Sequence, residues 1–136
     1  MKTPVILCVD DETNILKSLE RCFLSENMEV LLASSGKEAL VILEERGQDI
    51  DLMIIDQKMP EMTGDELLKN VRARFQGLPV IMLSGYADFE SLVRVISSGN
   101  LAYFIAKPWN NQELIDIVNT ALRKSFSAKG DNGVGE

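Results

Sequence analysis

Five polar residues stand where short apolar runs of the sequence end. They are Asp10, Asp11, Asp56, Ser84 and Lys107. Three carboxylates brought together repel one another, so a site that gathers them needs a cation. The chain contains no histidine, and its two cysteines lie in apolar patterns. The available ligands are therefore oxygen atoms, which favour Mg²⁺.

The lysine and the serine suggest a chemistry beyond metal binding. Lys107 supplies a positive charge that a purely structural metal site does not need. A carboxylate nucleophile, a metal ion, a lysine and a hydroxyl are the parts that stabilise a phosphoryl group during transfer. Taken singly, each residue also fits an ordinary turn, a strand end or a loop entry. Their position at four strand ends favours a site, because ligands of open α/β sheets bind at the carboxyl ends of the strands.

The elements that must position these residues follow from the hydrophobic pattern. The expected strands are Val5–Val9, Val30–Ala33, Leu52–Ile55, Val80–Leu83 and Leu101–Ala106. Several are apolar throughout, as strands covered on both faces are. The segments between them carry apolar residues at helical spacing, for example Phe89, Leu92, Val93 and Ile96. The pattern predicts an α/β fold of five βα units, a (βα)5 doubly wound parallel five-stranded sheet.

Helix boundaries carry separate signals. Ser35, Thr63 and Asn110 each stand three residues before a glutamate, the spacing of a capping box. Three glycines are expected to close the preceding helices in the left-handed conformation. These are Gly47, Gly77 and Gly99. The helical pattern fades near the end of the chain, so we expect one domain over residues 1–125 and a flexible tail or linker over residues 126–136.

Composition restricts the function classes. The chain has 136 residues, of which 46% are hydrophobic and 26% charged, as in an ordinary globular domain. Its formal net charge of −7 disfavours direct binding to nucleic acid or to an anionic membrane surface. Cys8 and Cys22 are expected to be small buried hydrophobes. The apolar run Val5–Val9 is too short for a signal peptide or a membrane span, so we expect a cytoplasmic protein.

Four motifs occur in order along the chain. They are Val9-Asp10-Asp11-Glu12, then Asp56-Gln57-Lys58-Met59-Pro60 with Gly64, then Ser84-Gly85, and then Lys107-Pro108. Together they resemble the bacterial response-regulator receiver, over about residues 3–125. The resemblance implies a flavodoxin-like strand order of 2-1-3-4-5. It also implies a phosphorylated switch of two-component signal transduction, which assists its own phosphorylation and dephosphorylation but is not otherwise an enzyme.

The resemblance assigns roles at the acidic cluster. Asp56 matches the aspartate that accepts the phosphoryl group. Asp10 and Asp11 match the pair that holds Mg²⁺, Asp10 through a water molecule. The backbone carbonyl of Lys58 would be a further metal ligand beside Asp56.

The resemblance also implies a conformational switch. Ser84 matches the switch hydroxyl, Lys107 the lysine that contacts the phosphoryl group, and Tyr103 the aromatic residue that changes rotamer. The Lys107-Pro108 peptide is expected to be cis. A plain half-buried aromatic is the alternative for Tyr103. Phosphorylation should reshape the face formed by helix four, strand five and helix five.

Partners follow from the same family. A sensor histidine kinase or a phosphotransfer protein would supply the phosphoryl group, and an output domain or a downstream protein would bind the switched face. A homodimer formed on phosphorylation is a further partner that the family allows. The segments Ser84–Asp88 and Lys107–Trp109 are similar to receivers fused to cyclic-di-GMP phosphodiesterase domains or transcriptional activators.

Two further positions bear on the lifetime of the phosphoryl group. Lys58 and Tyr86 match the positions that tune this lifetime in the family. A bulky Tyr86 can screen the phosphoryl group, and Lys58 can pair with its oxygens, so we expect slow self-dephosphorylation. Trp109, the sole tryptophan, lies two residues after Lys107. The surroundings of the Trp109 indole either change when a phosphoryl group binds, or the side chain is only a packing residue.

Three other functions compete. A phosphohydrolase of the haloacid-dehalogenase type needs a second aspartate two residues after its nucleophile, and Lys58 stands there. A flavodoxin-like FMN carrier needs a Ser/Thr-rich phosphate loop after the first strand, where Asp10, Asp11 and Glu12 would repel phosphate. A purely structural pseudo-receiver would lack one of the key residues, and none is lacking.

Overall fold

The computed structural model describes residues 2–85 and 103–134, with side chains up to residue 124. The elements are β1 (Val5–Val9), α1 (Thr13–Leu24), β2 (Glu29–Ala33), α2 (Gly36–Arg46), the short 3-10 helix η1 (Gly47–Asp49), β3 (Leu52–Asp56), α3 (Gly64–Arg74), β4 (Val80–Ser84), β5 (Tyr103–Ala106) and α5 (Asn111–Val134). The helix expected around residues 89–96 lies outside the described residues. The strands begin or end within one or two residues of the predicted positions.

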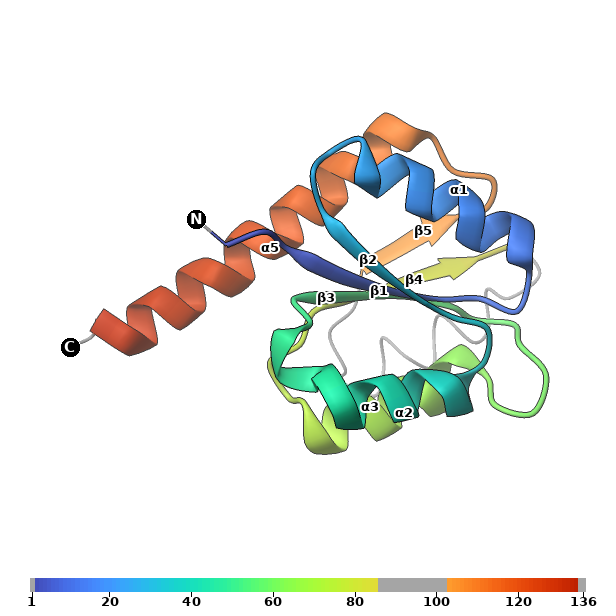
Figure 1. The fold of residues 1–136 in the computed structure, drawn as a ribbon, viewed down its shortest axis with the longest axis horizontal. Coiled ribbons are helices and arrows are strands. Elements are labelled where there is room, and N and C mark those ends of the chain that lie inside the picture. Colours follow the sequence, from blue (N-terminus) through green and yellow to red (C-terminus); the bar gives the residue numbers. More distant parts are fainter. Residues whose placement is uncertain (1, 86–102, 135–136) are drawn as a thin grey trace.

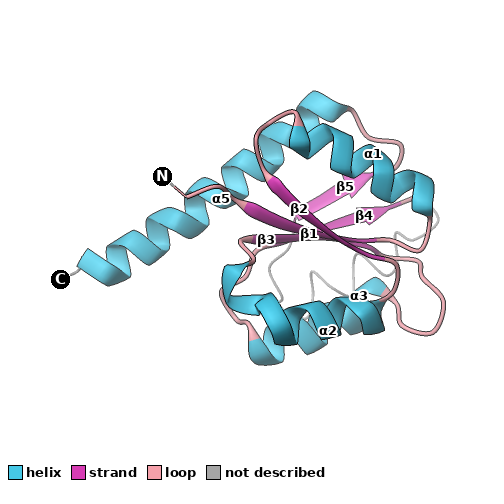
Figure 2. Cartoon of the chain, viewed as in Figure 1, coloured by secondary structure: helices cyan, strands magenta, loops and turns pink. Residues whose placement is uncertain are grey.

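The five strands form one parallel sheet in the order β2-β1-β3-β4-β5, as predicted. Helices α1 and α5 cover one face of the sheet, and α2 and α3 cover the other (Figures 1 and 2). All residues of β1, β3 and β4 are buried, which explains why these strands are apolar throughout. The chain leaves β1 for β2 on one side and returns to β3 on the other, so the strand order reverses beside β1. This is the place where sheets of this type bind ligands.

Each face of the sheet has its own hydrophobic layer, because neighbouring strand residues point to opposite faces. Leu7 and Ile55 pack toward α2 and α3. Ile6 and Cys8 pack with Cys22 toward α1 and α5. Both cysteines are buried and free, which confirms their predicted role as small core residues. The two layers hold the strand ends in a fixed register.

The predicted N-cap side chains are confirmed at three helices, and the full capping box is present at α3. The Ser35 hydroxyl accepts the backbone N–H of Glu38 at 3.1 Å. Thr63 and Glu66 form a complete reciprocal capping box at α3. The side chain of Asn110 accepts the N–H of Glu113 at 3.0 Å.

The predicted role of the glycines is wrong at Gly47 and Gly77. Gly47 follows α2 with an ordinary right-handed φ of −53°. It is needed for space, since a Cβ there would lie 2.5 Å from the Phe75 ring. Helix α3 ends at Arg74 with Phe75 as its C-cap, before Gly77. Gly99 lies outside the described residues.

The C-terminal helix is longer than the sequence pattern indicated. We expected a flexible end from residue 126, but α5 continues to Val134, and its last turns extend away from the sheet (Figure 1). No proline follows Pro108 in the chain, so nothing interrupts the backbone hydrogen bonds of the helix. A role of this segment as a linker stays a prediction. No helix in the described part of the chain is long and apolar enough to span a membrane.

Candidate functional site

The acidic cluster forms at the carboxyl ends of β1 and β3. Val9 pairs with Ile55, so Asp10 and Asp56, each one residue further, emerge side by side. Carboxylate oxygens of Asp10, Asp11 and Asp56 all lie within 4.8 Å of one another. Asp10 is fully buried, Asp56 is 4% exposed, and Asp11 faces solvent. The structure therefore brings the three predicted acidic residues together.

Lys107 places a positive charge against two of these carboxylates. Its Nζ lies 2.9 Å from Oδ1 of Asp56 and 3.1 Å from Oδ2 of Asp10. Lys107 directly follows β5, and its backbone N–H donates to the Ser84 carbonyl at 3.0 Å. The peptide between Lys107 and Pro108 is cis, as predicted. One side chain thus bridges the ends of β1 and β3 from the end of β5.

The three carboxylates of the cluster carry more negative charge than the single ammonium group of Lys107 can balance. Burial raises the pKa of Asp56 to about 6, against the hydrogen bond from Lys107, and the charge of Asp10 adds to the rise. Burial also raises the pKa of Asp10, although the N–H of Glu12 and the ammonium of Lys107 oppose it. Burial lowers the pKa of Lys107, but its bonds to the two carboxylates outweigh this and raise it. A further cation would relieve the repulsion.

The donor set fits Mg²⁺. This ion takes oxygen ligands at about 2.0–2.1 Å in an octahedron, so ligand oxygens lie roughly 3–4 Å from one another. Carboxylate oxygens within 4.8 Å of one another need only small shifts to reach these positions. Asp11 lies open to solvent, which leaves room for the water molecules that Mg²⁺ usually keeps.

The remaining predicted site residues lie at different distances from the cluster. Ser84 is the last residue of β4 and is buried, and its hydroxyl donates to the Gly85 carbonyl at 3.2 Å. Tyr103 stands at the start of β5, half-buried against the α1–α5 layer, with Lys124 Nζ 5.8 Å from its ring centre. The Lys58 side chain is exposed. Tyr86 lies outside the described residues.

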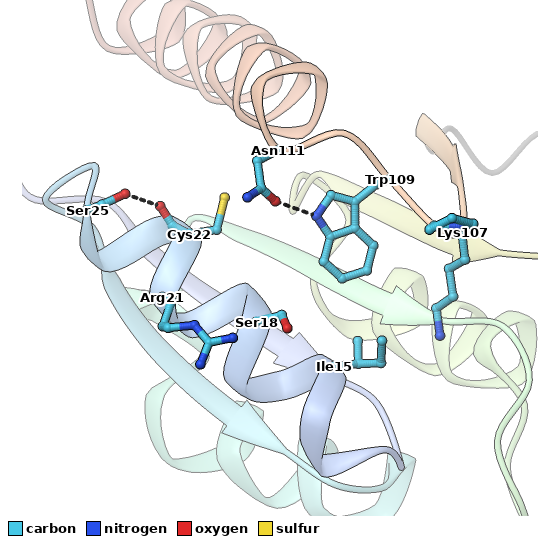
Figure 3. Close-up of a pocket in the computed structure, with 9 residues that line it drawn as sticks. Ile15, Ser18, Arg21, Cys22, Ser25, Lys107, Trp109 and Asn111 are labelled. Carbon is cyan, nitrogen blue, oxygen red and sulfur yellow. Dashed lines mark hydrogen bonds between the residues drawn. The ribbon is translucent and has the colours of Figure 1, made fainter.

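A cavity of about 610 Å³ lies beside Lys107, between α1 and the segment that joins β5 to α5 (Figure 3). Trp109 forms part of its wall, together with Ile15 and Cys22 of α1. The indole N–H of Trp109 donates to Oδ1 of Asn111 at 2.9 Å. Trp109 is therefore a packed side chain on the same short segment as Lys107.

Two residues of this region belong to the second motif, but the sequence reasoning gave them no role of their own. Gln57 is only 3% exposed, and its Nε2 donates to Oδ1 of Asp65 at 3.0 Å. Gly64 approaches the end of β3 so closely that a Cβ would lie 2.6 Å from the Asp56 carbonyl oxygen. A polar residue directly after a buried strand was the available signal for Gln57.

Comparisons with known proteins decide the family. A family model of the response regulator receiver domain matches residues 6–119. The chain belongs to this family. The receiver is 38% identical over 121 residues to the hydrogenase transcriptional regulatory protein HoxA of Cupriavidus necator, covering 89% of this chain and 24% of that protein. It is 37% identical over 118 residues to the regulatory protein AtoC of Escherichia coli, covering 87% of this chain and 25% of that protein. The chain thus spans about a quarter of the length of these relatives.

Solved structures agree with the assignment. A response regulator receiver domain from Clostridium thermocellum superimposes with a TM-score of 0.86 at 30% identity, covering 92% of this receiver and 98% of that chain. The signal receiver domain of an HD domain-containing protein from Pseudomonas fluorescens Pf-5 gives 0.86 at 28% identity, covering 93% and 99%. The resemblance inferred from the four motifs is confirmed. This receiver is a signalling switch of the two-component type.

Proposed function

We propose that this receiver accepts a phosphoryl group on Asp56 with the help of Mg²⁺ and thereby switches an output. The observation that carries the proposal is the bridging position of Lys107, which contacts both Asp56 and Asp10 at the acidic cluster. A structural ion pair requires only one carboxylate for each lysine. Lys107 contacts two carboxylates at once, and a phosphoryl group attached to Asp56 would lie close enough to bind it as well. A partner histidine kinase or a phosphotransfer protein would supply the phosphoryl group.

The side chains divide the work of phosphoryl transfer. The Asp56 carboxylate attacks phosphorus, so that a new bond joins its oxygen to phosphorus while the bond to the donor breaks. With a pKa of about 6, Asp56 is mostly ionised at neutral pH and competent to attack. Lys107 and Ser84 donate hydrogen bonds to the phosphoryl oxygens. Asp10, Asp11, Asp56 and the Lys58 carbonyl would hold Mg²⁺, which when bound neutralises negative charge on the transferring group.

The switch would run from the strand ends to the exposed face of the domain. Ser84 and Lys107 are joined by the backbone bond between their strands, so a displacement of either affects both β4 and β5. Tyr103 on β5 would respond, and the face formed by the fourth helix, β5 and α5 would bind the output or a second copy of the chain. The relative HoxA is named as a transcriptional regulatory protein. We extend that class of output to this receiver, acting in the cytoplasm without contacting nucleic acid or membrane itself.

Phosphorylation with a small phosphodonor tests the proposal. In the presence of Mg²⁺ and acetyl phosphate, the intact mass of the wild-type protein should increase by one phosphoryl group. The Asp56→Asn variant should gain nothing. Asp51→Asn is the matched control, because Asp51 is also buried but lies beside the other end of β3, bonded to the Val5 N–H at 2.9 Å. It should be labelled like wild type.

Two results would contradict the proposal. Equal labelling of wild type and Asp56→Asn would place the phosphoryl group elsewhere. Full labelling in EDTA would remove the need for a metal ion. Sustained turnover of small phosphoesters would instead favour a phosphohydrolase.

A further inference from the structure

The loop that joins β3 to α3, residues 57–63, is closed by hydrogen bonds between its first residue and the start of α3. The Gly64 N–H donates to the Gln57 carbonyl at 2.9 Å. The Gln57 Nε2 donates to Oδ1 of Asp65 at 3.0 Å, and the Thr63 hydroxyl donates to the same oxygen at 2.6 Å. Asp65 therefore ties both ends of the loop together. We call the Gln57–Asp65 bond the loop brace.

Packing alone does not account for a glutamine at position 57. Its side chain is almost fully buried, and within the described residues its Oε1 atom has no hydrogen-bond partner. A buried amide oxygen without a partner lowers stability compared with an apolar side chain of similar size. The Nε2 bond to Asp65 is what the glutamine adds, and a leucine there could not form it.

The loop brace lies next to the predicted metal ligand. Asp56, Gln57 and Lys58 are consecutive, so the direction of the Lys58 carbonyl depends on the backbone that the brace holds. Partners that orient a metal ligand strongly affect metal affinity, although they do not touch the ion. We propose that Gln57 is a positioning residue, whose bond to Asp65 fixes the loop so that the Lys58 carbonyl faces the acidic cluster. This inference rests on the proposed function.

Direct measurement of Mg²⁺ affinity, without phosphorylation, tests the role of the brace. Isothermal titration calorimetry should show about tenfold weaker Mg²⁺ binding for Gln57→Leu, which removes the donor. Asp65→Ala removes the acceptor of both the Gln57 and the Thr63 bonds and should cause a loss at least as large. The double variant should be no weaker than Asp65→Ala alone, because that variant already lacks the Gln57 bond. Asp65→Asn removes the charge but keeps an acceptor oxygen, so it should bind Mg²⁺ nearly as wild type does.

Thermal melting in EDTA separates positioning from stability. Gln57→Leu removes the unpaired buried oxygen, so its metal-free melting temperature should equal or exceed that of wild type while its Mg²⁺ affinity falls. The matched control is Gln112→Leu, which breaks a similar glutamine–aspartate bond of 2.9 Å to Asp116 on the exposed side of α5. It should leave Mg²⁺ affinity unchanged.

Three outcomes are decisive. Wild-type affinity in Gln57→Leu, or losses that add in the double variant, would overturn the positioning role while the proposed function stands. If Gln57→Leu fails to fold, the test passes to the half-exposed Asp65. Weaker Mg²⁺ binding in Asp65→Ala than in Asp65→Asn would support the positioning role, and equal binding in the two variants would overturn it. Absence of Mg²⁺ binding in wild type would overturn the proposed function, and this inference with it.

Discussion

In the absence of Mg²⁺, replacing Asp56 by asparagine should stabilise the folded domain, although Asp56 forms an ion pair with Lys107 at 2.9 Å. The reason is that burial and the nearby charge of Asp10 destabilise the ionised Asp56 carboxylate by more than Lys107 stabilises it. The pKa of Asp56 is raised from 3.8 to about 6, despite the hydrogen bond from Lys107. Asparagine has nearly the same shape and no charge to desolvate.

The size of the effect follows from this pKa. An aspartate whose pKa rises from 3.8 to about 6 on folding lowers the free energy of unfolding by about 3 kcal/mol at pH 7. This figure already includes the hydrogen bond from Lys107, which lowers the pKa and is lost in the variant. Lys107 keeps its bond to Asp10. We expect a net stabilisation of up to about 3 kcal/mol, or roughly 10 °C in melting temperature for a domain of this size.

The effect should depend on pH with a definite sign. Between pH 3.8 and about 6 the folded state binds more protons at Asp56 than the unfolded state does, so the contribution of Asp56 to stability falls as pH rises through this window. Below it Asp56 is protonated in both states. The difference in melting temperature between Asp56→Asn and wild type should therefore be small near pH 4, grow to pH 6 and stay constant above pH 7.

Thermal denaturation in EDTA at several pH values measures this difference. Asp51→Asn provides the contrast, since the Asp51 carboxylate accepts the Val5 N–H at 2.9 Å and lies 3.5 Å from Lys2 Nζ. Weakening these bonds should lower stability by about 1 kcal/mol. A lower melting temperature for Asp56→Asn at pH 7 would refute the reasoning. So would a difference from wild type that does not change with pH.

Three further predictions concern the phosphorylated or metal-bound protein, and a fourth concerns the stability of the fold. Lys58→Asn and Tyr86→Ala should each lose the phosphoryl group faster than wild type, measured as decay of the phosphorylated intact mass; equal rates would mean that neither side chain screens the site. Trp109 emission should change when Mg²⁺ and beryllofluoride bind, because Lys107 lies two residues away, and an unchanged spectrum would leave it a packing residue only. Hydrogen exchange should change in residues 84–109 under the same conditions, whereas a change confined to α2 would count against the proposed face. Gly64→Ala should destabilise the fold by about 2 kcal/mol in chemical denaturation, since its Cβ would lie 2.6 Å from the Asp56 carbonyl oxygen; wild-type stability would show that the loop can move aside.

The sheet and the main site residues could be predicted because they depend on local patterns. Buried parallel strands are short apolar runs, and the residue at the end of each run lies at the same edge of the sheet as its neighbours. Asp10 and Asp56 were found in this way, and the register of Val9 with Ile55 places them side by side. The pattern therefore specified the position of the cluster as well as its members.

Features that depend on distant contacts could not be predicted. The need for glycine at position 47 arises from the ring of Phe75, which is far away in the sequence. The bond between Gln57 and Asp65 depends on how tightly Gly64 folds the loop back onto the end of β3. A sequence pattern shows that Gln57 is polar, but it does not show that the side chain is buried or which partner it finds.

The charges at the site agree with the proposed roles of a metal ion and of Lys107 in phosphorylation. Three carboxylates and the ammonium of Lys107 leave two negative charges, which one divalent cation neutralises. If Asp56 is phosphorylated as proposed, its own charge is lost and nearly two negative charges are added on the phosphoryl group, so the site would become negative again even with Mg²⁺ bound. Lys107 and Ser84, at the ends of β5 and β4, are hydrogen-bond donors that could bind the added phosphoryl oxygens. The backbones of these two residues are hydrogen-bonded to each other. A movement of either side chain toward the phosphoryl group would therefore displace both strands and the connection that leads to α5.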